Sequence, residues 1–344
     1  MGFLGCLEFN LRGHAFPGWS SAESRRAVAQ ELLAMLLKMR RRKWAFTAEM
    51  AQLSQAERLL LLERAQITGA MAARQDGVHV LINDRQDTEC YINDEEHFLL
   101  KAFFPGEEGL RAAQAELGRL LADFGKKLPI AHDAVFGYLS CDPAKGGEAL
   151  FFSCLLHLPA LKLARHMLCA QSALDEMGVF LSPIFTTEQK VDPGDMYLLH
   201  SPAAATGKLD AALKTMELAN SAICTQELHA REKLLEQPRQ AARVRSLLDR
   251  AYHLLTRSDK LKYRDLLSSL SLLRLGLSCG ILRAEAGSDE TAALLNRAYY
   301  QNAPLHMTHA LGLTRQSERL QTRARCAREL VLDQLRLYFP DSQN

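Results

Sequence analysis

The chain has 344 residues, of which 48% are hydrophobic and 24% charged, and its formal net charge at pH 7 is +2. This is ordinary globular composition, and the length predicts two or three structural units. A nearly neutral chain has no general electrostatic attraction to nucleic acid or to an anionic membrane, so neither is an expected partner.

The eight cysteines are spread singly, without a CxxC pair or a cysteine–histidine spacing that suits zinc. No metal site is therefore expected, and the pattern is typical of a reducing cytoplasm. The start "MGFLGCLEF" lacks the basic residues and sustained apolar run of a signal peptide, and no stretch approaches the roughly 20 apolar residues that cross a bilayer. The predicted localisation is cytoplasmic.

The first part of the chain predicts helices. Two capping-box patterns, "SSAE" at 20–23 and "SQAE" at 54–57, each precede an apolar-rich run. They predict a small helical unit over about residues 18–75. The basic run at 40–43 is expected at a helix C-terminus, where cations are favoured, and a phosphate or nucleic-acid patch is the alternative.

From Gly77 the chain changes to short β-favouring runs. They are "VHVLIND" at 78–84, "ECYI" at 89–92, "FLLKAFF" at 98–104, "AVFGYLSC" at 134–141, "ALFFSCLLHLP" at 149–159 and "DMYLLHS" at 195–201. The first links are too short for the helical crossover that parallel strands need, so an antiparallel sheet is expected. Gly146 and Gly147 mark either a plain turn between two strands or a loop that approaches a phosphate.

Helical periodicity returns at 107–124, 160–177 and 208–237, and the pattern is purely helical after Pro238. The predicted fold class is α+β. Three domains are expected: a small helical N-terminal domain at 1–75, an antiparallel sheet flanked by helices at 76–240, and a helical C-terminal domain at 241–344.

One segment, "CYINDEEHFLLKAF" at 90–103, gathers three carboxylates and a histidine between two apolar runs. Its core "YINDEEHFLL" resembles the Asn-Glu-Glu-Asp-His-x-Arg signature of the guanidino (phosphagen) kinase family. The stretch "GYLSCDPAKGGEALFFSCLLHLPAL" at 137–161 is similar to that family's Gly-Tyr-Leu to Leu-Pro block. With "NLRGHAFP" at 10–17 and the helical texture of 250–282, the resemblance is nearest to the bacterial protein-arginine kinases and covers roughly residues 4–335.

The resemblance implies an eight-stranded antiparallel sheet that holds the active site, a small helical N-terminal domain and, in the bacterial branch, a helical domain for dimerisation and phosphoarginine binding. It implies transfer of the γ-phosphoryl group of Mg-ATP to an arginine of a protein. The family surrounds the triphosphate with arginines, whose planar guanidinium groups match phosphate oxygens.

The positions of those phosphate-binding arginines carry other residues in this chain. By the resemblance they fall on Leu4, Cys6, Leu99, Phe151 and, near the substrate loop, Ser182. A further arginine of the N-terminal stretch falls on Phe9. Apolar side chains would line the site and leave the charge of a triphosphate uncompensated. We also expect Leu99 and Phe151 to pack together where a nucleotide would sit.

The substrate side of the motif keeps more of its residues. Glu95 occupies the place of the family's catalytic glutamate, and His97 that of the motif's histidine. Both either retain guanidinium recognition or form a polar strand end held by local hydrogen bonds. The reactive cysteine position is Asp142, and Cys141 lies one residue earlier, on the opposite face of a strand. The family's second acidic residue, on its flexible loop, has no clear equivalent in this chain, although Glu188 is nearby.

The C-terminal helices resemble the phosphoarginine-binding part of the bacterial branch. Its Arg-Asp-x-x-Arg-Ala element matches "ERLQTRA" at 318–324, where Arg319 and Arg323 keep the two cations and Leu320 replaces the acid. The basic residues of this region form either an anion-binding face or a solvated helix face, and they are Arg315, Arg319, Arg323, Arg325 and Arg328.

Three functions follow from these observations. The first is a degenerate kinase, or pseudokinase, that binds or regulates a partner: an active arginine kinase, its activator or Clp-type protease components. The second is an active protein-arginine kinase that holds Mg-ATP through Arg12, Lys145 or Lys190. The third is a non-enzymatic phosphoarginine-binding adaptor. No cofactor is expected unless the second holds, and a homodimer through the C-terminal helices is an expectation from the resemblance.

Overall fold

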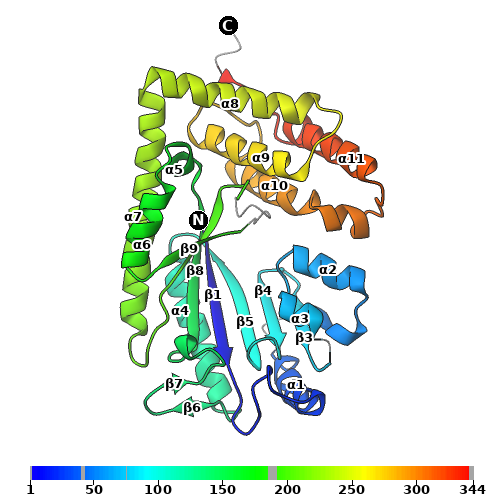
Figure 1. The fold of residues 1–344 in the computed structure, drawn as a ribbon, viewed down its shortest axis with the longest axis vertical. Helices are drawn as coiled ribbons and strands as arrows, with labels where there is room; N and C mark the ends of the chain where they lie inside the picture. Colours follow the sequence, from blue (N-terminus) through cyan, green and yellow to red (C-terminus); the bar gives the residue numbers. More distant parts are fainter. Residues whose placement is uncertain (1, 40–42, 75, 185–191, 341–344) are drawn as a thin grey trace. The chain divides into compact units, whose positions relative to one another are not determined.

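The computed structural model describes residues 2–39, 43–74, 76–184 and 192–340 (Figure 1). Residues 40–42 of the basic run, Glu188 and Lys190 lie outside this part of the chain. No helix within the described ranges is long and apolar enough to span a membrane.

Two compact units make up the chain, and the boundaries of these units differ from those of the three predicted domains. The first unit comprises Met1–Leu155, Leu174–Leu181 and Leu198–Asn220, and the second comprises Leu156–Ala173, Ser182–Tyr197 and Ser221–Asn344.

Ten strands are described. They are β1 (Gly2–Phe9), β2 (Trp44–Glu49), β3 (His79–Asn83), β4 (Thr88–Ile92), β5 (Phe98–Pro105), β6 (His132–Asp133), β7 (Gly137–Tyr138), β8 (Leu150–His157), β9 (Phe180–Pro183) and β10 (Met196–His200). Eight of them form one sheet in the order β2-β3-β4-β5-β1-β8-β10-β9, while β6 pairs with β7. The described pairings among β1 to β5 and β8 are antiparallel, so the predicted antiparallel sheet is confirmed.

The helices account for most of the remaining chain. The α-helices are α1 (Ala22–Leu36), α2 (Gln55–Glu63), α3 (Gly69–Ala73), α4 (Gly109–Gly125), α5 (Pro159–Leu163), α6 (Met167–Glu176), α7 (Leu209–Glu236), α8 (Pro238–Arg257), α9 (Tyr263–Ser278), α10 (Ser288–Gln301) and α11 (Gln316–Glu329). Short 3-10 or π-helical turns are η1 (Met50–Gln52), η2 (Pro143–Lys145), η3 (His306–Ala310) and η4 (Leu330–Gln334).

Several element predictions need correction. Region 1–75 is not helical throughout, because β1 lies between β5 and β8 inside the sheet and β2 forms one edge of it. Within the run predicted as a strand at 134–141, the structure has only the two-residue strand Gly137–Tyr138 and one isolated bridge. The helix expected at 160–177 is divided into α5 and α6, because Arg165 adopts a left-handed backbone with φ of 62°.

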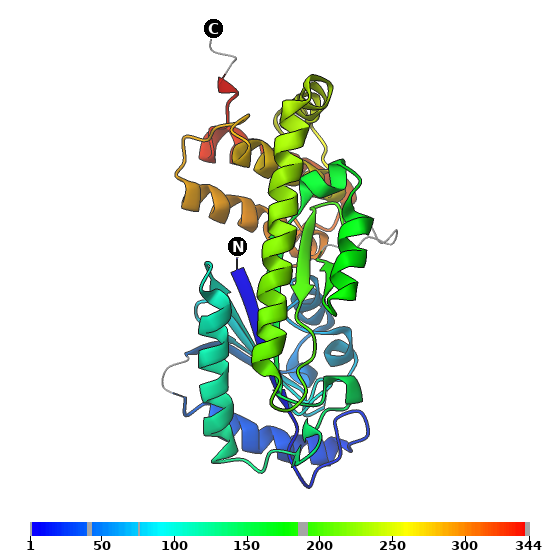
Figure 2. The same cartoon turned by 90° about the vertical axis from the view of Figure 1, so that its left-hand side faces the viewer.

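The hydrophobic core of the first unit lies on both faces of the sheet. On one face, α4 packs along β1, and Figure 2 shows the teal helix beside the blue strand. Phe9 of β1 stacks on Phe98 of β5 with ring centroids 4.6 Å apart, and both rings meet Phe124 of α4 edge-on. This face is therefore closed by aromatic packing.

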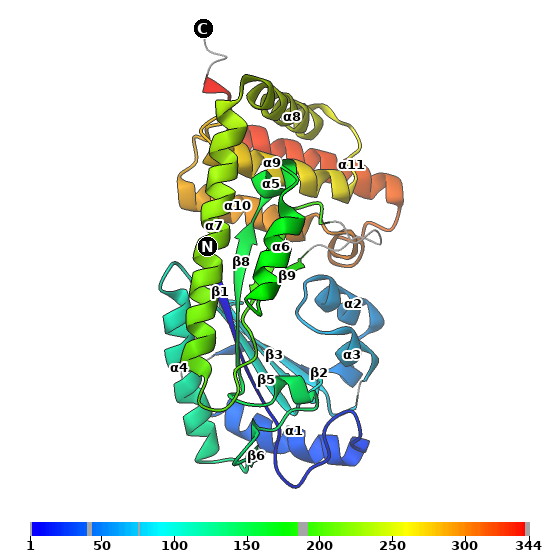
Figure 3. The same ribbon diagram turned by 60° about the vertical axis from the view of Figure 1, so that its left-hand side comes forward.

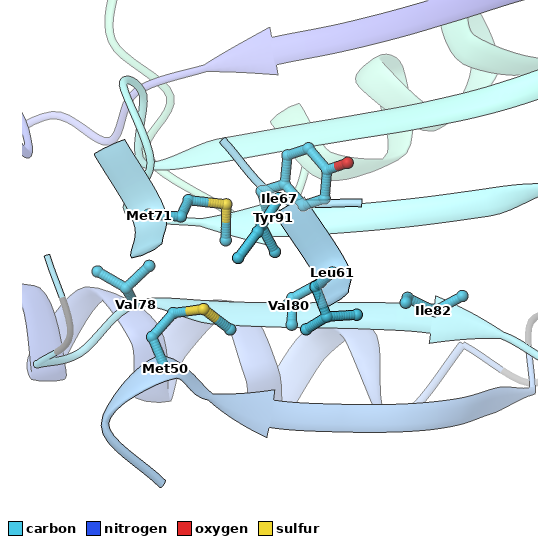
Figure 4. Packing of buried hydrophobic residues seen from close by; sticks show 8 residues of the cluster. All are labelled: Met50, Leu61, Ile67, Met71, Val78, Val80, Ile82 and Tyr91. Carbon is cyan, nitrogen blue, oxygen red and sulfur yellow. The ribbon is translucent and has the colours of Figure 1, made fainter. Parts of the chain in front are cut away.

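On the other face of the sheet, α2 and α3 cover β3 and β4 (Figure 4). The cluster there consists of Met50, Leu61, Ile67, Met71, Val78, Val80, Ile82 and Tyr91. The capping box at Ser54 and Glu57 is formed as predicted and fixes the start of α2. The rest of this face, over β5, β1 and β8, carries the predicted site residues.

The core of the second unit is built from α8, α9, α10 and α11. Their buried residues recur at helical spacing, as Val244, Leu248, Ala251 and Leu255 do along α8. In the same unit α5 lies beside α7 (Figure 3). There the Glu227 carboxylate accepts hydrogen bonds from the backbone N–H groups of Ala160 and Leu161, which fixes the start of α5 against α7.

Candidate functional site

Four of the five positions where the resemblance places phosphate-binding arginines lie together on one sheet face. Cys6 of β1 is paired with Phe151 of β8, and Glu8 of β1 is paired with Leu99 of β5. Leu4 lies two residues before Cys6 and so shares its face. Each of the four is partly exposed, whereas the alternate residues of β1 are buried. Strand register therefore brings these four positions together, and their role as a former phosphate site stays a prediction.

Two expectations about this face are wrong. Phe9 does not line it, because strand alternation turns its ring to the opposite face, where it stacks on Phe98. Leu99 packs against the cluster under α2 and α3 rather than with Phe151, and β1 lies between the strands that carry the two residues. Ser182 lies on β9 and belongs to the second unit.

Lys101 occupies the centre of the same face, paired with Cys6 on one side and Glu89 on the other. Its Nζ atom lies 4.0 Å from the Glu89 carboxylate, 3.4 Å from the Tyr91 hydroxyl and 5.3 Å from the centre of the Tyr91 ring. The Tyr91 hydroxyl donates to Glu89 at 2.6 Å. Burial raises the pKa of the Cys6 thiol to about 11, although Lys101 opposes the shift. The central cation is thus already matched by an anion.

The two consecutive glutamates of the motif have different surroundings. Glu96 is buried and accepts hydrogen bonds from the Asn10 amide, from the Ser140 hydroxyl at 2.5 Å and from the backbone N–H of Cys141 at 3.0 Å. The side chain of Glu95 is 60% exposed, and its carboxylate lies 3.3 Å from Lys145 Nζ. Glu95 is therefore the glutamate of this pair that is open to a ligand.

Lys145 also lies 3.8 Å from Glu8, a residue that the sequence did not single out. Burial raises the pKa of Glu8 to about 7, against the opposing effect of Lys145. Burial alone would lower the pKa of Lys145, but Glu8 and Glu95 outweigh it and the net shift is upward. The signal for Glu8 was the alternation of "LGCLEF", which places it on the face of Leu4 and Cys6.

His97 is buried within a local hydrogen-bond network. Its Nδ1 atom accepts from the backbone N–H of Leu11 at 3.0 Å, which leaves Nε2 to donate to the Ala15 carbonyl at 3.1 Å. Burial lowers the pKa of His97 to about 4, so the ring is neutral at pH 7. Of the two readings of His97, this geometry favours the local one, because both ring nitrogens hold the segment that follows β1.

The position of the family's reactive cysteine carries an exposed aspartate that has a structural contact. Asp142 precedes η2 and accepts a hydrogen bond from the backbone N–H of Ala144 at 3.0 Å. The neighbouring Cys141 thiol has its pKa raised to about 12, first by burial and then by a hydrogen bond to Glu96. A thiol with so high a pKa supplies no thiolate near pH 7.

Arg319 and Arg323, the predicted phosphoarginine ligands, donate to backbone carbonyl groups. Arg323 is 3% exposed, and its guanidinium donates to the carbonyls of Asn302 and Leu261. Arg319 donates to the carbonyls of Leu313 and Thr314. These contacts give both arginines a structural role and leave Arg323 almost no surface for a ligand.

Taken together, the face presents carboxylates and apolar groups around two lysines that already face acids. Such a surface suits a cationic or guanidinium group near Glu95 and does not suit a polyanion. Arg12, one of the alternative phosphate ligands, instead donates to the carbonyl of His132 at 3.3 Å. Lys145, another of them, is held between Glu8 and Glu95.

Comparison with known proteins gives a family match over the part of the chain that carries β5 and β8 of this face, while β1 lies before the matched residues. Residues 28–208 match the family described as "ATP:guanido phosphotransferase, C-terminal catalytic domain". A protein-arginine kinase of Moorella thermoacetica is 28% identical over 337 residues, which are 94% of this chain and 91% of that protein. A protein-arginine kinase of Halothermothrix orenii is 27% identical over 303 residues, 88% of this chain and 83% of that protein.

Solved structures share the fold at low sequence identity. A duplicated taurocyamine kinase from Schistosoma mansoni aligns with a TM-score of 0.56 and 18% identity, covering 66% of this chain and 32% of that one. A lombricine kinase aligns with a TM-score of 0.56 and 15% identity, covering 66% of this chain and 65% of that one. The chain thus spans about a third of the duplicated enzyme and just under two thirds of the lombricine kinase.

Proposed function

The chain belongs to the ATP:guanido phosphotransferase family, and we propose that it is a member that has lost phosphoryl transfer and acts by binding or regulating a protein partner. The observation that carries the proposal is the composition of the central sheet face. Four neighbouring positions on this face, where the family resemblance places arginines, carry Leu4, Cys6, Leu99 and Phe151.

Magnitudes support the loss of nucleotide binding. A hydrogen bond to a charged group contributes about 1.5–3 kcal/mol. Replacing five arginines by apolar or small residues therefore forfeits on the order of 5–10 kcal/mol, after discounting for non-additivity. Micromolar binding corresponds to only about 8 kcal/mol in total. The residues of this face do not fit Mg-ATP held in the family's manner.

The lysines of the face do not replace the missing charge. Lys101 faces Glu89, and Lys145 faces Glu8 and Glu95. A triphosphate would have to separate these pairs and would then lie beside the released carboxylates, which repel it. The exposed Glu95 can still orient a guanidinium group, but without a bound phosphoryl donor it has no group to transfer.

The retained fold and motif acids support a binding role. Two relatives named protein-arginine kinase match this chain over most of its length, and Glu95 remains open on the surface. We propose that the partner belongs to the arginine-phosphorylation system: an active kinase of the family, its activator or a Clp-type protease component. Homodimerisation and a cytoplasmic location remain predictions of the same proposal.

The first experiment tests the loss of transfer. The full chain is incubated with Mg-ATP and an arginine-rich protein, and acid-labile phosphoarginine is measured. We expect no product above background from this chain or from its Glu95→Gln and Glu107→Gln variants. Robust phosphorylation that disappears in Glu95→Gln but persists in Glu107→Gln, an exposed glutamate at another place, would overturn the proposal.

The second experiment tests regulation. The rate of a purified, active protein-arginine kinase is measured with increasing amounts of the chain. We expect the rate to change at micromolar concentrations and the effect to weaken with Glu95→Gln. An unchanged rate, together with no co-migration of the two proteins in size-exclusion chromatography, would remove an active kinase from the possible partners.

A further inference from the structure

A hollow of about 430 Å³ lies wholly within the second compact unit, and it shares no residue with the sheet face described above. It is bounded by the turn between α5 and α6, the second half of α7 and the first turns of α8. Buried Ala230 and Leu234 of α7 form part of its floor. Its volume is within the range of about 300–1,000 Å³ that is typical of small-molecule sites.

The walls of this hollow are strongly basic. They carry Arg165, His166, His229, Lys233 and Arg243. His229 and Lys233 are four residues apart on α7 and so share one face of the helix. No aspartate or glutamate is among the described residues that line the hollow, and its other polar side chains are glutamines.

The arginine and lysine side chains that line the hollow form no ion pair with an acidic residue of the described chain. No ion pair is formed there by Arg165, Lys233 or Arg243, whereas nearby Arg231 is paired with Glu227 at 2.8 Å. Of the histidines, His229 has an acidic neighbour, with its Nδ1 atom 3.8 Å from the Glu232 carboxylate. Like charges held together around a concave surface attract a counter-ion of opposite sign.

Two backbone features add to this attraction. Arg165 adopts a left-handed backbone with φ of 62°, which costs an L-residue about 1–2 kcal/mol. Glycine or asparagine is usual in such a turn, whereas here the turn places an arginine in the wall of the hollow. The N-terminus of the 20-residue α8 also borders the hollow, and Gln237 forms no side-chain cap there. Unpaired backbone N–H groups at a helix start favour anions.

We propose that this hollow binds a small, multiply charged phosphate anion such as pyrophosphate. Arg165, Lys233 and Arg243 contact its oxygens, and the glutamines donate further hydrogen bonds. Phosphoarginine fits less well, because no carboxylate in the hollow would receive its guanidinium group. The site is separate from the sheet face, so it can exist whether or not the proposed function holds.

The test is isothermal titration of sodium pyrophosphate into the full chain at low ionic strength, where anion sites are strongest. We expect saturable binding that each of Lys233→Gln and Arg243→Gln weakens at least about fivefold. Arg165→Asn, which suits the left-handed backbone, is expected to do the same. The matched control is Arg257→Gln, in the last turn of α8, which should leave the affinity unchanged.

Each outcome decides the proposal. Absence of saturable binding, or equal weakening by Arg257→Gln, would overturn it, since the latter indicates general charge attraction. Phosphoarginine that binds more tightly than pyrophosphate would also contradict the assigned chemistry. Nucleotide binding that Arg243→Gln removes belongs to this hollow, whereas nucleotide binding that survives this variant belongs elsewhere and bears on the kinase proposal instead.

Discussion

At the scale of single residues, the motif acids show how a catalytic sequence can serve folding. Glu96 lies in the link between β4 and β5, and it accepts hydrogen bonds from Asn10, Ser140 and Cys141, which tie this link to two distant parts of the chain. Its neighbour Glu95 makes an exposed ion pair with Lys145, and such pairs contribute little to stability. The fold alone therefore accounts for a glutamate at position 96, whereas it does not account for one at position 95, where a surface contact with a ligand or partner would.

Glu8 gives a prediction about pH. Its pKa in the folded chain is about 7, against an ordinary value of 4.5, because burial disfavours the carboxylate. Between these values the folded state binds more protons than the unfolded state, so stability falls as pH rises. Glu8→Gln removes this loss. At pH 8 the variant should gain up to about 3 kcal/mol, reduced by the lost contact with Lys145, and at pH 4 almost nothing.

The measurement is the free energy of unfolding in urea at pH 4 and pH 8, for the original chain and the variant. Glu107→Gln is the control, because it makes the same chemical change at an exposed position. Equal effects of Glu8→Gln at the two pH values would contradict the assigned burial of the charge.

At the scale of elements, Gly147 explains how the loop before β8 is held. Its φ is +137°, and an added Cβ atom would lie 2.1 Å from the carbonyl oxygen of Ala204. Tyr138 and Gly147 exchange backbone hydrogen bonds across this turn. The glycine is thus required by close backbone approach, which agrees with a plain turn and needs no phosphate.

Gly147→Ala should therefore destabilise the chain by about 2–4 kcal/mol, through backbone strain and the clash with Ala204. Gly118→Ala is the matched control: it lies inside α4 with no atom within 4 Å of the new Cβ, and should add about 0.5–1 kcal/mol. Urea unfolding midpoints measure both. Similar small effects of the two substitutions would show that the turn tolerates a side chain.

Sequence patterns predicted most elements of the sheet and the long helices, and the misses have physical causes. The bounds of β3, β4, β5 and α7 follow their hydrophobic periods closely. Strand β2 was missed because "WAFTAE" forms a sheet edge with mostly exposed side chains, so it has no strong alternation. The break at Arg165 could not be predicted, since arginine gives no signal for a left-handed backbone.

At the scale of the whole molecule, the family resemblance supplied the candidate positions, whereas their surroundings depend on strand pairing and tertiary contacts that the sequence did not show. Alternation along β1 brings Leu4 and Cys6 to one face. The pairing of Lys101 with Glu89, and the burial of Arg323 under two carbonyl groups, depend on elements distant in sequence. The sequence therefore predicted a ligand site or a solvated face for the basic pattern, whereas three of its arginines, Arg319, Arg323 and Arg328, donate to backbone carbonyl groups.

The fold of this molecule does not depend on the four positions where the family resemblance places arginines, because most of the core lies away from them. Function resides in side chains carried by a fold, so arginines at those positions should restore affinity for nucleotide without changing the architecture. We predict that a variant with Leu4→Arg, Cys6→Arg, Leu99→Arg and Phe151→Arg binds Mg-ATP at least about tenfold more tightly than the original chain, a gain of roughly 1.4 kcal/mol.

The gain is smaller than four independent hydrogen bonds would give, because Glu8 and Glu89 compete for the new cations. The variant should also lose stability, since Leu99→Arg removes a side chain that packs under α2 and α3. Titration of Mg-ATP measures the affinity, and the same four positions changed to glutamine provide the control without charge. An arginine variant that binds no better than the glutamine variant, while folded by circular dichroism, would mean that this face is not the former phosphate site.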